Sequence, residues 1–422
     1  MNLNLIMANR PISKLILLGF VCVLYFITSN TEAKSFDIIH PIILVPGDGG
    51  SQVDAKLNKS SVVHYICEKT TSDYFNIWLN LELLVPLVID CWVDNMRLEY
   101  DNITRTTHNP PGVELRIPGF GDPFSVEWLD PTKVSAGAYF KTIGDALVSL
   151  GYERNISLRG APYDFRKAPN ENQDFFVNFK KLIEETYEMN NKSNVILVAH
   201  SMGSPMCLQF LQKQTQAWKD EYIRALVTLS GPWGGSVKAI KVFTVGDDLG
   251  VYILKESWLR DMQITSPSLA WLLPLKSFWN SSETLIETDT KNYTIDDLQD
   301  YFFDIDYPLA WEMWKDVEPY TRDFTAPGVE VHCLHGVGVQ TVDRLAYKKG
   351  KFPYGYPNFV YGDGDGTVNL RSLEGCLQWK TQQKQPVYHQ TFSKMDHMDI
   401  LSDGRILQYI TSLLPKLARN NN

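Results

Sequence analysis

The sequence predicts an α/β fold in which a mostly parallel β-sheet is covered by helices on both faces. Short apolar runs rich in β-favouring residues occur at 38–45, 195–198 and 225–229. Runs of this length are typical of strands with both faces buried. Segments with helical periodicity lie between them, at 139–150 and 175–189. Strands that alternate with helices in this way predict parallel strands joined by crossover helices.

Length and composition fit a large globular domain with insertions. The chain has 422 residues, of which 44% are hydrophobic, so it can bury a sizeable core. Its 49 acidic residues outnumber 40 Lys and Arg, giving a formal charge of −9. A long basic run, the electrostatic footprint of nucleic-acid binding, is missing from the sequence. We therefore predict no nucleic-acid partner.

The N-terminal segment 1–33 has the features of a secretory signal peptide. Arg10 and Lys14 precede an apolar run at 15–27, and small residues follow at the two positions that a signal peptidase recognises. This run is short for a membrane span but suits a cleaved signal. We predict that 34–422 is the mature core, with a retained signal anchor as the alternative.

Glycosylation signals and cysteines agree with an oxidising compartment. Six acceptor sequons begin at Asn58, Asn102, Asn155, Asn191, Asn280 and Asn292. One of the six cysteines lies in the predicted signal, and the other five favour two disulfides and one free thiol. The sequence does not fix the connectivity. Our hypothesis pairs Cys67 with Cys91 and Cys333 with Cys376, and treats Cys207 as a small buried apolar group.

The loop after the first predicted strand is rich in glycine, with Asp48 at its centre. Glycines directly after a core strand let backbone N–H groups point into a site. In a hydrolase the first oxyanion-hole donor belongs in this loop. An ordinary exit from a strand is the alternative.

Segment 67–105 is predicted to be a small insertion closed by a disulfide. A bridge from Cys67 to Cys91 would stabilise it by ~3 kcal/mol in the loop-entropy model, so its apolar side chains need not be buried. We predict a membrane-binding finger, with a core helix as the alternative. The side chains expected to enter lipid are Trp78, Leu79, Leu81, Leu83 and Leu84.

Residues 195–203 form the strongest local motif. Four β-favouring residues precede the turn Ala199-His200-Ser201-Met202-Gly203, and helix-compatible sequence follows at 204–214. Such a turn presents a serine where a strand becomes a helix, which is the nucleophile elbow of an α/β-hydrolase. Ala199 replaces the first glycine of the usual G-x-S-x-G pattern. A serine that caps a helix after a strand is the alternative.

Residues 232–327 interrupt the alternation of strands and helices. Tryptophan, proline and other aromatic residues cluster there, so we predict a cap insertion over the carboxyl end of the sheet, with 242–254 as a mobile lid. A sequence pattern typical of a strand returns at 328–336. His332 and His335 lie on this strand but point to opposite faces, so we predict no metal site.

The remaining members of a catalytic triad are expected near the C-terminus. Asp365 lies in a glycine-rich loop after a late strand, and His397 precedes the last helix, which begins near 405. Ser201, Asp365 and His397 follow one another in the α/β-hydrolase order. The alternative for the glycine-rich loop is a calcium site, but Val368 stands where the sharp turn of such a loop requires glycine.

Several longer motifs then resemble the lecithin:cholesterol acyltransferase family, and its lysosomal phospholipase A2 members in particular, over essentially the whole mature chain. They are Val45-Pro46-Gly47-Asp48, Trp78-Leu79-Asn80-Leu81-Glu82-Leu83, Arg159-Gly160-Ala161-Pro162-Tyr163-Asp164, Ala199-His200-Ser201-Met202-Gly203, Gly231-Pro232-Trp233-Gly234-Gly235 and Gly362-Asp363-Gly364-Asp365-Gly366-Thr367-Val368. The resemblance implies that Asp48 and Met202 supply the oxyanion-hole N–H groups. It also implies the disulfide pairing and the finger stated above. Cys207 departs from the family pattern.

The resemblance further implies a serine-dependent phospholipase A and O-acyltransferase that uses no cofactor and no metal. The acyl group would pass from Ser201 to water or to a lipid alcohol such as ceramide. The expected partner is an anionic phospholipid membrane bound peripherally, by a monomer located in the lysosome or secreted. The alternatives are a lecithin:cholesterol-type acyltransferase, a neutral-lipid lipase and a non-catalytic lipid-binding protein.

Overall fold

The computed structural model describes residues 40–249 and 255–419. The expected signal peptide at 1–33 and residues 250–254 of the expected lid lie outside this part of the chain. Among the helices that it describes, none combines the length and apolar character that crossing a membrane requires.

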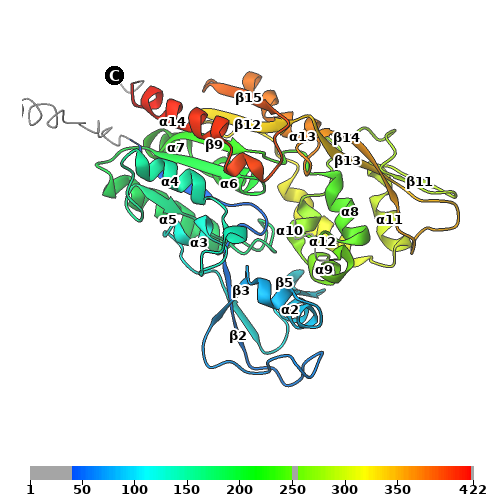
Figure 1. The fold of residues 1–422 in the computed structure, drawn as a ribbon. Helices are drawn as coiled ribbons and strands as arrows, with labels where there is room; N and C mark the ends of the chain where they lie inside the picture. The colour runs from blue at the N-terminus through cyan, green and yellow to red at the C-terminus, as the bar shows by residue number, and fades with distance from the viewer. Residues whose placement is uncertain (1–39, 250–254, 420–422) are drawn as a thin grey trace, which may run out of the picture. The chain divides into compact units, whose positions relative to one another are not determined.

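A six-stranded sheet organises the described residues (Figure 1). Its strands run in the order β15-β12-β9-β8-β1-β7, and every neighbouring pair is parallel. Every residue of β1 and β8 is buried, as their apolar sequences predict. The strands are β1 (Ile42–Val45), β7 (Leu158–Gly160), β8 (Val195–His200), β9 (Ile223–Leu229), β12 (Val331–Val337) and β15 (Val387–Ser393).

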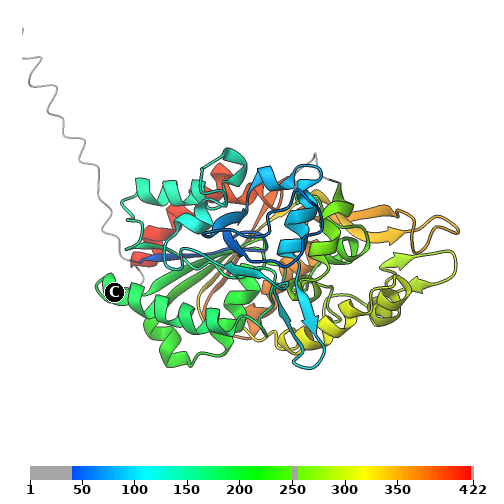
Figure 2. The ribbon, with the colours of Figure 1, turned by 90° about the horizontal axis from the view of Figure 1, so that it is seen from below.

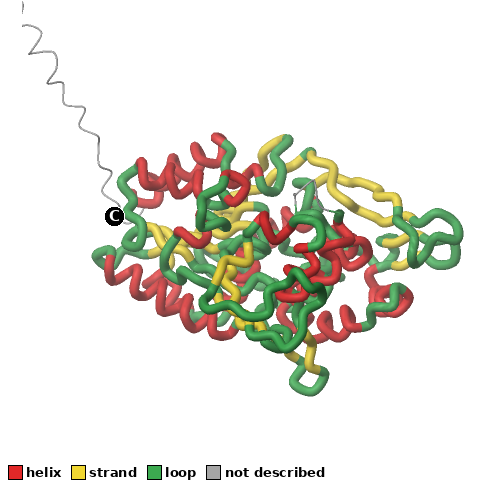
Figure 3. Tube along the Cα trace, turned by 60° about the horizontal axis from the view of Figure 1, so that its bottom comes forward, coloured by secondary structure: helices red, strands yellow, loops and turns green. Residues whose placement is uncertain are grey.

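Helices cover this sheet on both faces, which confirms the predicted fold class (Figures 2 and 3). One face carries α4 (Lys141–Ser149) and α14 (Gly404–Arg419), which contact each other. The other carries α5 (Gln173–Met189), α6 (Gly203–Gln212) and α7 (Gln216–Tyr222). The rings of Phe179 on α5 and Phe210 on α6 pack edge to face with centroids 4.9 Å apart.

The chain between β9 and β12 builds a second group of helices beside the sheet. These helices are α8 (Val237–Val245), α9 (Glu256–Gln263), α10 (Pro267–Trp271), α11 (Leu298–Asp304) and α12 (Leu309–Val317). An antiparallel pair, β13 (Val339–Ala346) and β14 (Asn358–Gly364), packs on α8 and is extended by β10 (Ile286–Glu287) and β11 (Asn292–Tyr293). β14 ends directly before Asp365.

A third group of elements surrounds the first disulfide. β2 (Val53–Leu57) pairs with β3 (Phe75–Trp78) and β6 (Val113–Arg116), and β4 (Glu99–Asp101) pairs with β5 (Thr106–His108). The finger itself contains η1 (Leu81–Leu84) and α2 (Val88–Met96). The structure contains both expected disulfides: Cys67–Cys91 closes the finger, and Cys333–Cys376 joins β12 to η5 (Glu374–Thr381).

The orientation predicted for three finger side chains is wrong. Trp78 is 6% exposed, and its indole N–H donates to the carbonyl of Gly49 at 2.7 Å, while neighbouring aromatic rings pack against it. Leu79 and Leu84 are also buried. All three side chains belong to the buried hydrophobic core, so they hold the finger against the rest of the protein. Leu81 is exposed and Leu83 is half-buried.

Candidate active site

The turn after β8 forces Ser201 into a strained conformation. Its φ of 51° lies in the left-handed region, which is uncommon for a residue other than glycine. The surrounding backbone is tightly packed: a Cβ on Gly47 would lie 2.6 Å from Cβ of Ser201, and one on Gly203 would lie 2.4 Å from the carbonyl oxygen of Pro46. A larger residue at either glycine would therefore clash with this backbone. The absence of side chains at Gly47 and Gly203 lets the loop after β1 contact the elbow.

Three side chains from distant parts of the chain meet at this elbow. Nε2 of His397 lies 2.9 Å from Oγ of Ser201, and Nδ1 of His397 lies 2.7 Å from Oδ2 of Asp365. The backbone N–H of His397 also donates to the carbonyl of Asp365 at 2.8 Å. The structure thus brings together the three residues proposed from sequence, in the order nucleophile, base and acid that a serine triad requires.

Asp365 is fully buried and is held in the ionised form by its partners. Burial alone would raise the pKa of its carboxyl, but the charge of His397, the hydrogen bond to His397 and the N–H groups of Val368 and Thr367 outweigh burial. The pKa of Asp365 is therefore lowered from its ordinary value. Those two N–H groups donate to Oδ1, which leaves Oδ2 to orient the imidazole.

The two residues expected to form the oxyanion hole flank Ser201. Met202 follows it and caps α6, while Asp48 follows Gly47 in the loop that packs on the elbow. The Asp48 side chain keeps solvent-accessible surface. Desolvation by the surrounding protein, followed by the negative charge of Asp247, nevertheless raises the pKa of Asp48 to about 7. The hydrogen bond from the Gly49 N–H and the charge of Lys238 oppose this rise.

Two buried polar residues at the site were not assigned roles from the sequence. Tyr139 and His200 are 4% and 1% exposed and hydrogen-bond to each other beneath Ser201. A signal was available for His200, because a histidine that ends a fully buried strand needs hydrogen-bond partners. Tyr139 offered no comparable signal, since it appeared only as the start of an amphipathic helix.

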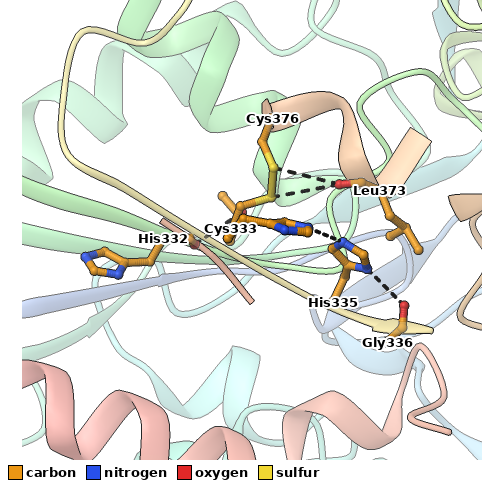
Figure 4. Close-up of a disulfide and its surroundings, with 8 residues drawn as sticks. His332, Cys333, His335, Gly336, Leu373 and Cys376 are labelled. Atoms are coloured by element: carbon orange, nitrogen blue, oxygen red, sulfur yellow. Dashed lines mark hydrogen bonds between the residues drawn. A yellow bond between two sulfur atoms is a disulfide. The ribbon is translucent and has the colours of Figure 1, made fainter. Parts of the chain in front are cut away.

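The sequon asparagines, the histidines of β12 and Cys207 lie outside the triad. The side chains of all six sequon asparagines are exposed. Figure 4 shows His332 pointing away from His335, with Cys333 facing Cys376. Within the described residues, no group of three or more His, Cys, Asp or Glu side chains could hold a metal ion. Cys207 is completely buried on α6, and burial raises the pKa of its thiol.

Comparisons with known proteins find relatives that cover most of the chain. The chain is 46% identical to the human protein named lysosomal phospholipase A and acyltransferase, over 89% of this chain and 90% of that relative. It is 41% identical to phosphatidylcholine-sterol acyltransferase from Gallus gallus, over 90% and 91% of the two chains. A solved structure titled the Tle4-Tli4 complex covers 91% of this chain and 99% of its own, with 13% identity and a TM-score of 0.49.

The family model described as lecithin:cholesterol acyltransferase matches residues 74–404. This range begins in the finger and extends to the start of α14, so it includes the elbow, the acid and the histidine. The resemblance inferred from the motifs is confirmed, and the chain belongs to the lecithin:cholesterol acyltransferase family.

Proposed function

We propose that the protein is a serine-dependent phospholipase A and O-acyltransferase. The observation that carries this proposal is the continuous chain of hydrogen bonds from Ser201 through His397 to Asp365. A serine hydroxyl is a weak nucleophile unless a base accepts its proton, and this chain supplies an oriented base. The names of the relatives support acyl esters of phospholipids as the substrate class.

The reaction proceeds in two acyl transfers. Nε2 of His397 accepts the proton of Ser201 as Oγ attacks the ester carbonyl, and the N–H groups of Asp48 and Met202 hold the oxyanion. Removing one such donor costs ~3 kcal/mol of barrier. The tetrahedral intermediate expels the lysophospholipid, whose oxygen takes the proton from His397. Water or a lipid alcohol such as ceramide then attacks the acyl-serine, and His397 repeats its role.

The membrane contact of this enzyme is the finger. Its buried face includes Trp78, Leu79 and Leu84, while other apolar side chains face solvent. The exposed apolar residues of segment 67–105 are Leu81, Val85, Leu87 and Ile103. Exposed apolar groups on a disulfide-closed projection suit insertion into the interface of an anionic phospholipid membrane. Leu81 therefore remains a proposed membrane contact, whereas Trp78, Leu79 and Leu84 do not, because they are buried.

We further propose that the enzyme is a glycosylated monomer, located in the lysosome or outside the cell after removal of residues 1–33.

The cap expected at 232–327 would cover the reacting acyl chain. Ser236, which caps α8, donates to the carbonyl of Thr367 and so holds this insertion beside the triad acid. Exclusion of water from the acyl-serine by the cap would favour a lipid alcohol over water as acceptor.

A fluorophosphonate probe, which reacts with activated serines, tests the proposal. Wild type should be labelled stoichiometrically, Ser201→Ala should not be labelled, and the surface variant Ser149→Ala should behave as wild type. Turnover of phosphatidylcholine liposomes with added ceramide or cholesterol then identifies the acceptor by the acylated product. Labelling that survives in Ser201→Ala would disprove the nucleophile, and equal transfer to cholesterol would favour the sterol acyltransferase alternative.

A further inference from the structure

A buried hydrogen-bond chain runs beneath the nucleophile and connects three loops of the site. The N–H of Gly47 donates to the hydroxyl oxygen of Tyr139 at 3.0 Å, and the Tyr139 hydroxyl lies 2.5 Å from Nδ1 of His200. Nε2 of His200 lies 2.9 Å from the carbonyl oxygen of His397. The chain therefore joins the loop after β1, the residue before the nucleophile and the backbone of the general base.

The direction of each bond follows from its partners. A carbonyl oxygen only accepts, so Nε2 of His200 must carry a hydrogen. Neutral His200 then presents a lone pair at Nδ1, to which the Tyr139 hydroxyl donates. The Tyr139 oxygen in turn accepts from Gly47. Each donor has an acceptor, so the network forms with a single arrangement of protons.

This arrangement remains intact in acid. Burial, followed by the charge of His397, lowers the pKa of His200 to about 3 despite the hydrogen bond to the His397 carbonyl. Protonation would add a hydrogen at Nδ1 and oblige Tyr139 to turn its own hydrogen away. Because His200 stays neutral down to about pH 3, the Tyr139 to His200 bond persists in an acidic compartment.

We propose that Tyr139 and His200 are positioning residues that hold the loop of the general base and the oxyanion-hole loop in register with Ser201. His397 is fixed through its N–H by the Asp365 carbonyl and through its own carbonyl by His200. Gly47 precedes Asp48, so its fixed N–H also orients the peptide whose N–H is assigned to the oxyanion. This inference rests on the proposed function, since it concerns the same acyl transfer.

Tyr139→Phe isolates the hydroxyl, because the ring remains packed against the loop after β1. We expect kcat on a short soluble ester to fall by about tenfold or more with KM nearly unchanged, since a misplacement of 1 Å in an active site costs about 100-fold. The matched control is Tyr152→Phe. Tyr152 is also buried, and its hydroxyl donates to the His40 carbonyl at 3.0 Å, away from the triad. It should lose thermal stability and keep kcat.

Two substitutions of His200 test its hydrogen bond to the His397 carbonyl separately from its bond to Tyr139. The side-chain amide of Gln reaches the position of Nε2 and can donate to the His397 carbonyl, whereas Asn is too short. His200→Gln should therefore label with fluorophosphonate faster than His200→Asn. Tyr139→Phe combined with His200→Gln should lose little more than the worse single variant, because both break one chain.

The outcomes distinguish the inference from the proposed function. If wild type is not labelled, the proposed function fails. If wild type is labelled at Ser201 but Tyr139→Phe keeps the kcat of Tyr152→Phe, the positioning role is refuted. Should Tyr139→Phe not fold, the two His200 variants decide: labelling of His200→Asn as fast as His200→Gln, at equal thermal stability, refutes the role as well.

Discussion

Asp363 and Asp365 lie two residues apart in one glycine-rich loop, but they contact different partners. Oδ2 of Asp365 contacts His397, whereas Oδ1 of Asp363 accepts the N–H groups of Gly338 and Gly364 at the surface. Only Asp365 can fix the tautomer of the general base. The hydrogen bonds thus identify the triad acid, which composition and spacing alone do not distinguish from its neighbour.

Asp365→Asn is expected to lower kcat by about 10⁴-fold, because the amide favours the wrong tautomer of His397. Asp363→Asn is the matched control and should retain most of the activity. Initial rates on a soluble ester, measured for variants with unchanged melting temperature, check this ranking. The reverse order would transfer the role of acid to Asp363.

Asp48 gives a second prediction, which concerns pH. Its carboxyl is neutral below a pKa of about 7 and ionised above it. An ionised carboxylate beside the oxyanion hole repels the developing negative charge, so activity should decline as pH rises through about 7. Asp48→Asn stays neutral and should keep its soluble-ester activity on the alkaline side. Superimposable pH profiles of the two proteins would show that Asp48 is not the titrating group.

Individual residues also mark the limit of prediction from sequence. Ser201, Asp365 and His397 could be proposed because each stands in a local pattern and their order is specific. The burial of Trp78 could not be proposed, since it depends on Gly49 and on Trp92 and Phe165, which the fold brings to its ring. A tryptophan that contacts lipid and one that supports a catalytic loop have the same local sequence.

Among the elements, the finger combines an inner face that packs and an outer face that does not. Val85 and Leu87 lie on the outer face, 41% and 61% exposed. Val85→Asn with Leu87→Asn should reduce sedimentation with anionic liposomes while sparing turnover of a soluble ester. Asn suits position 87 because the φ there is 73°.

The control for the finger replaces exposed apolar residues on helices of the main sheet, Val148→Gln on α4 with Val177→Gln on α5. This pair removes comparable apolar surface elsewhere on the molecule. Equal loss of liposome binding in both double variants would mean that the finger has no special affinity for lipid. Equal loss of liposome and soluble-ester turnover in the finger variant would indicate damage to the site.

Strands and helices were predicted well where both faces are apolar or where the helical period is regular. β8 and β9 coincide closely with their apolar runs, and α5 begins two residues before its predicted start. Prediction was weakest at 232–327, because short helices that pack in several directions leave no single period in the sequence.

For the whole molecule, charge should decide how membrane binding depends on acidity. At pH 7 the formal charge is −9, with 49 carboxylates and 8 histidines able to take up protons in acid. Inert Ser201→Ala protein should sediment with anionic liposomes increasingly as pH falls from about 8 to about 4. Added salt should weaken this binding, because screening is effective beyond about 10 Å at 0.1 M. Binding to anionic liposomes that does not change with pH would exclude adsorption as a source of acid preference.

The pairing of β1 with strands far along the chain has a consequence for synthesis. β1 lies between β7 and β8 in the sheet, so Ile42 to Val45 emerge from the ribosome long before either partner exists. Cys67 and Cys91, in contrast, are separated by only 24 residues and can be oxidised while the sheet is incomplete. The finger can thus close first, next to an unpaired apolar strand that is prone to aggregation until β8 is translated. Chaperone binding to the nascent chain is accordingly expected to concentrate on β1 and to end once the elbow has been synthesised.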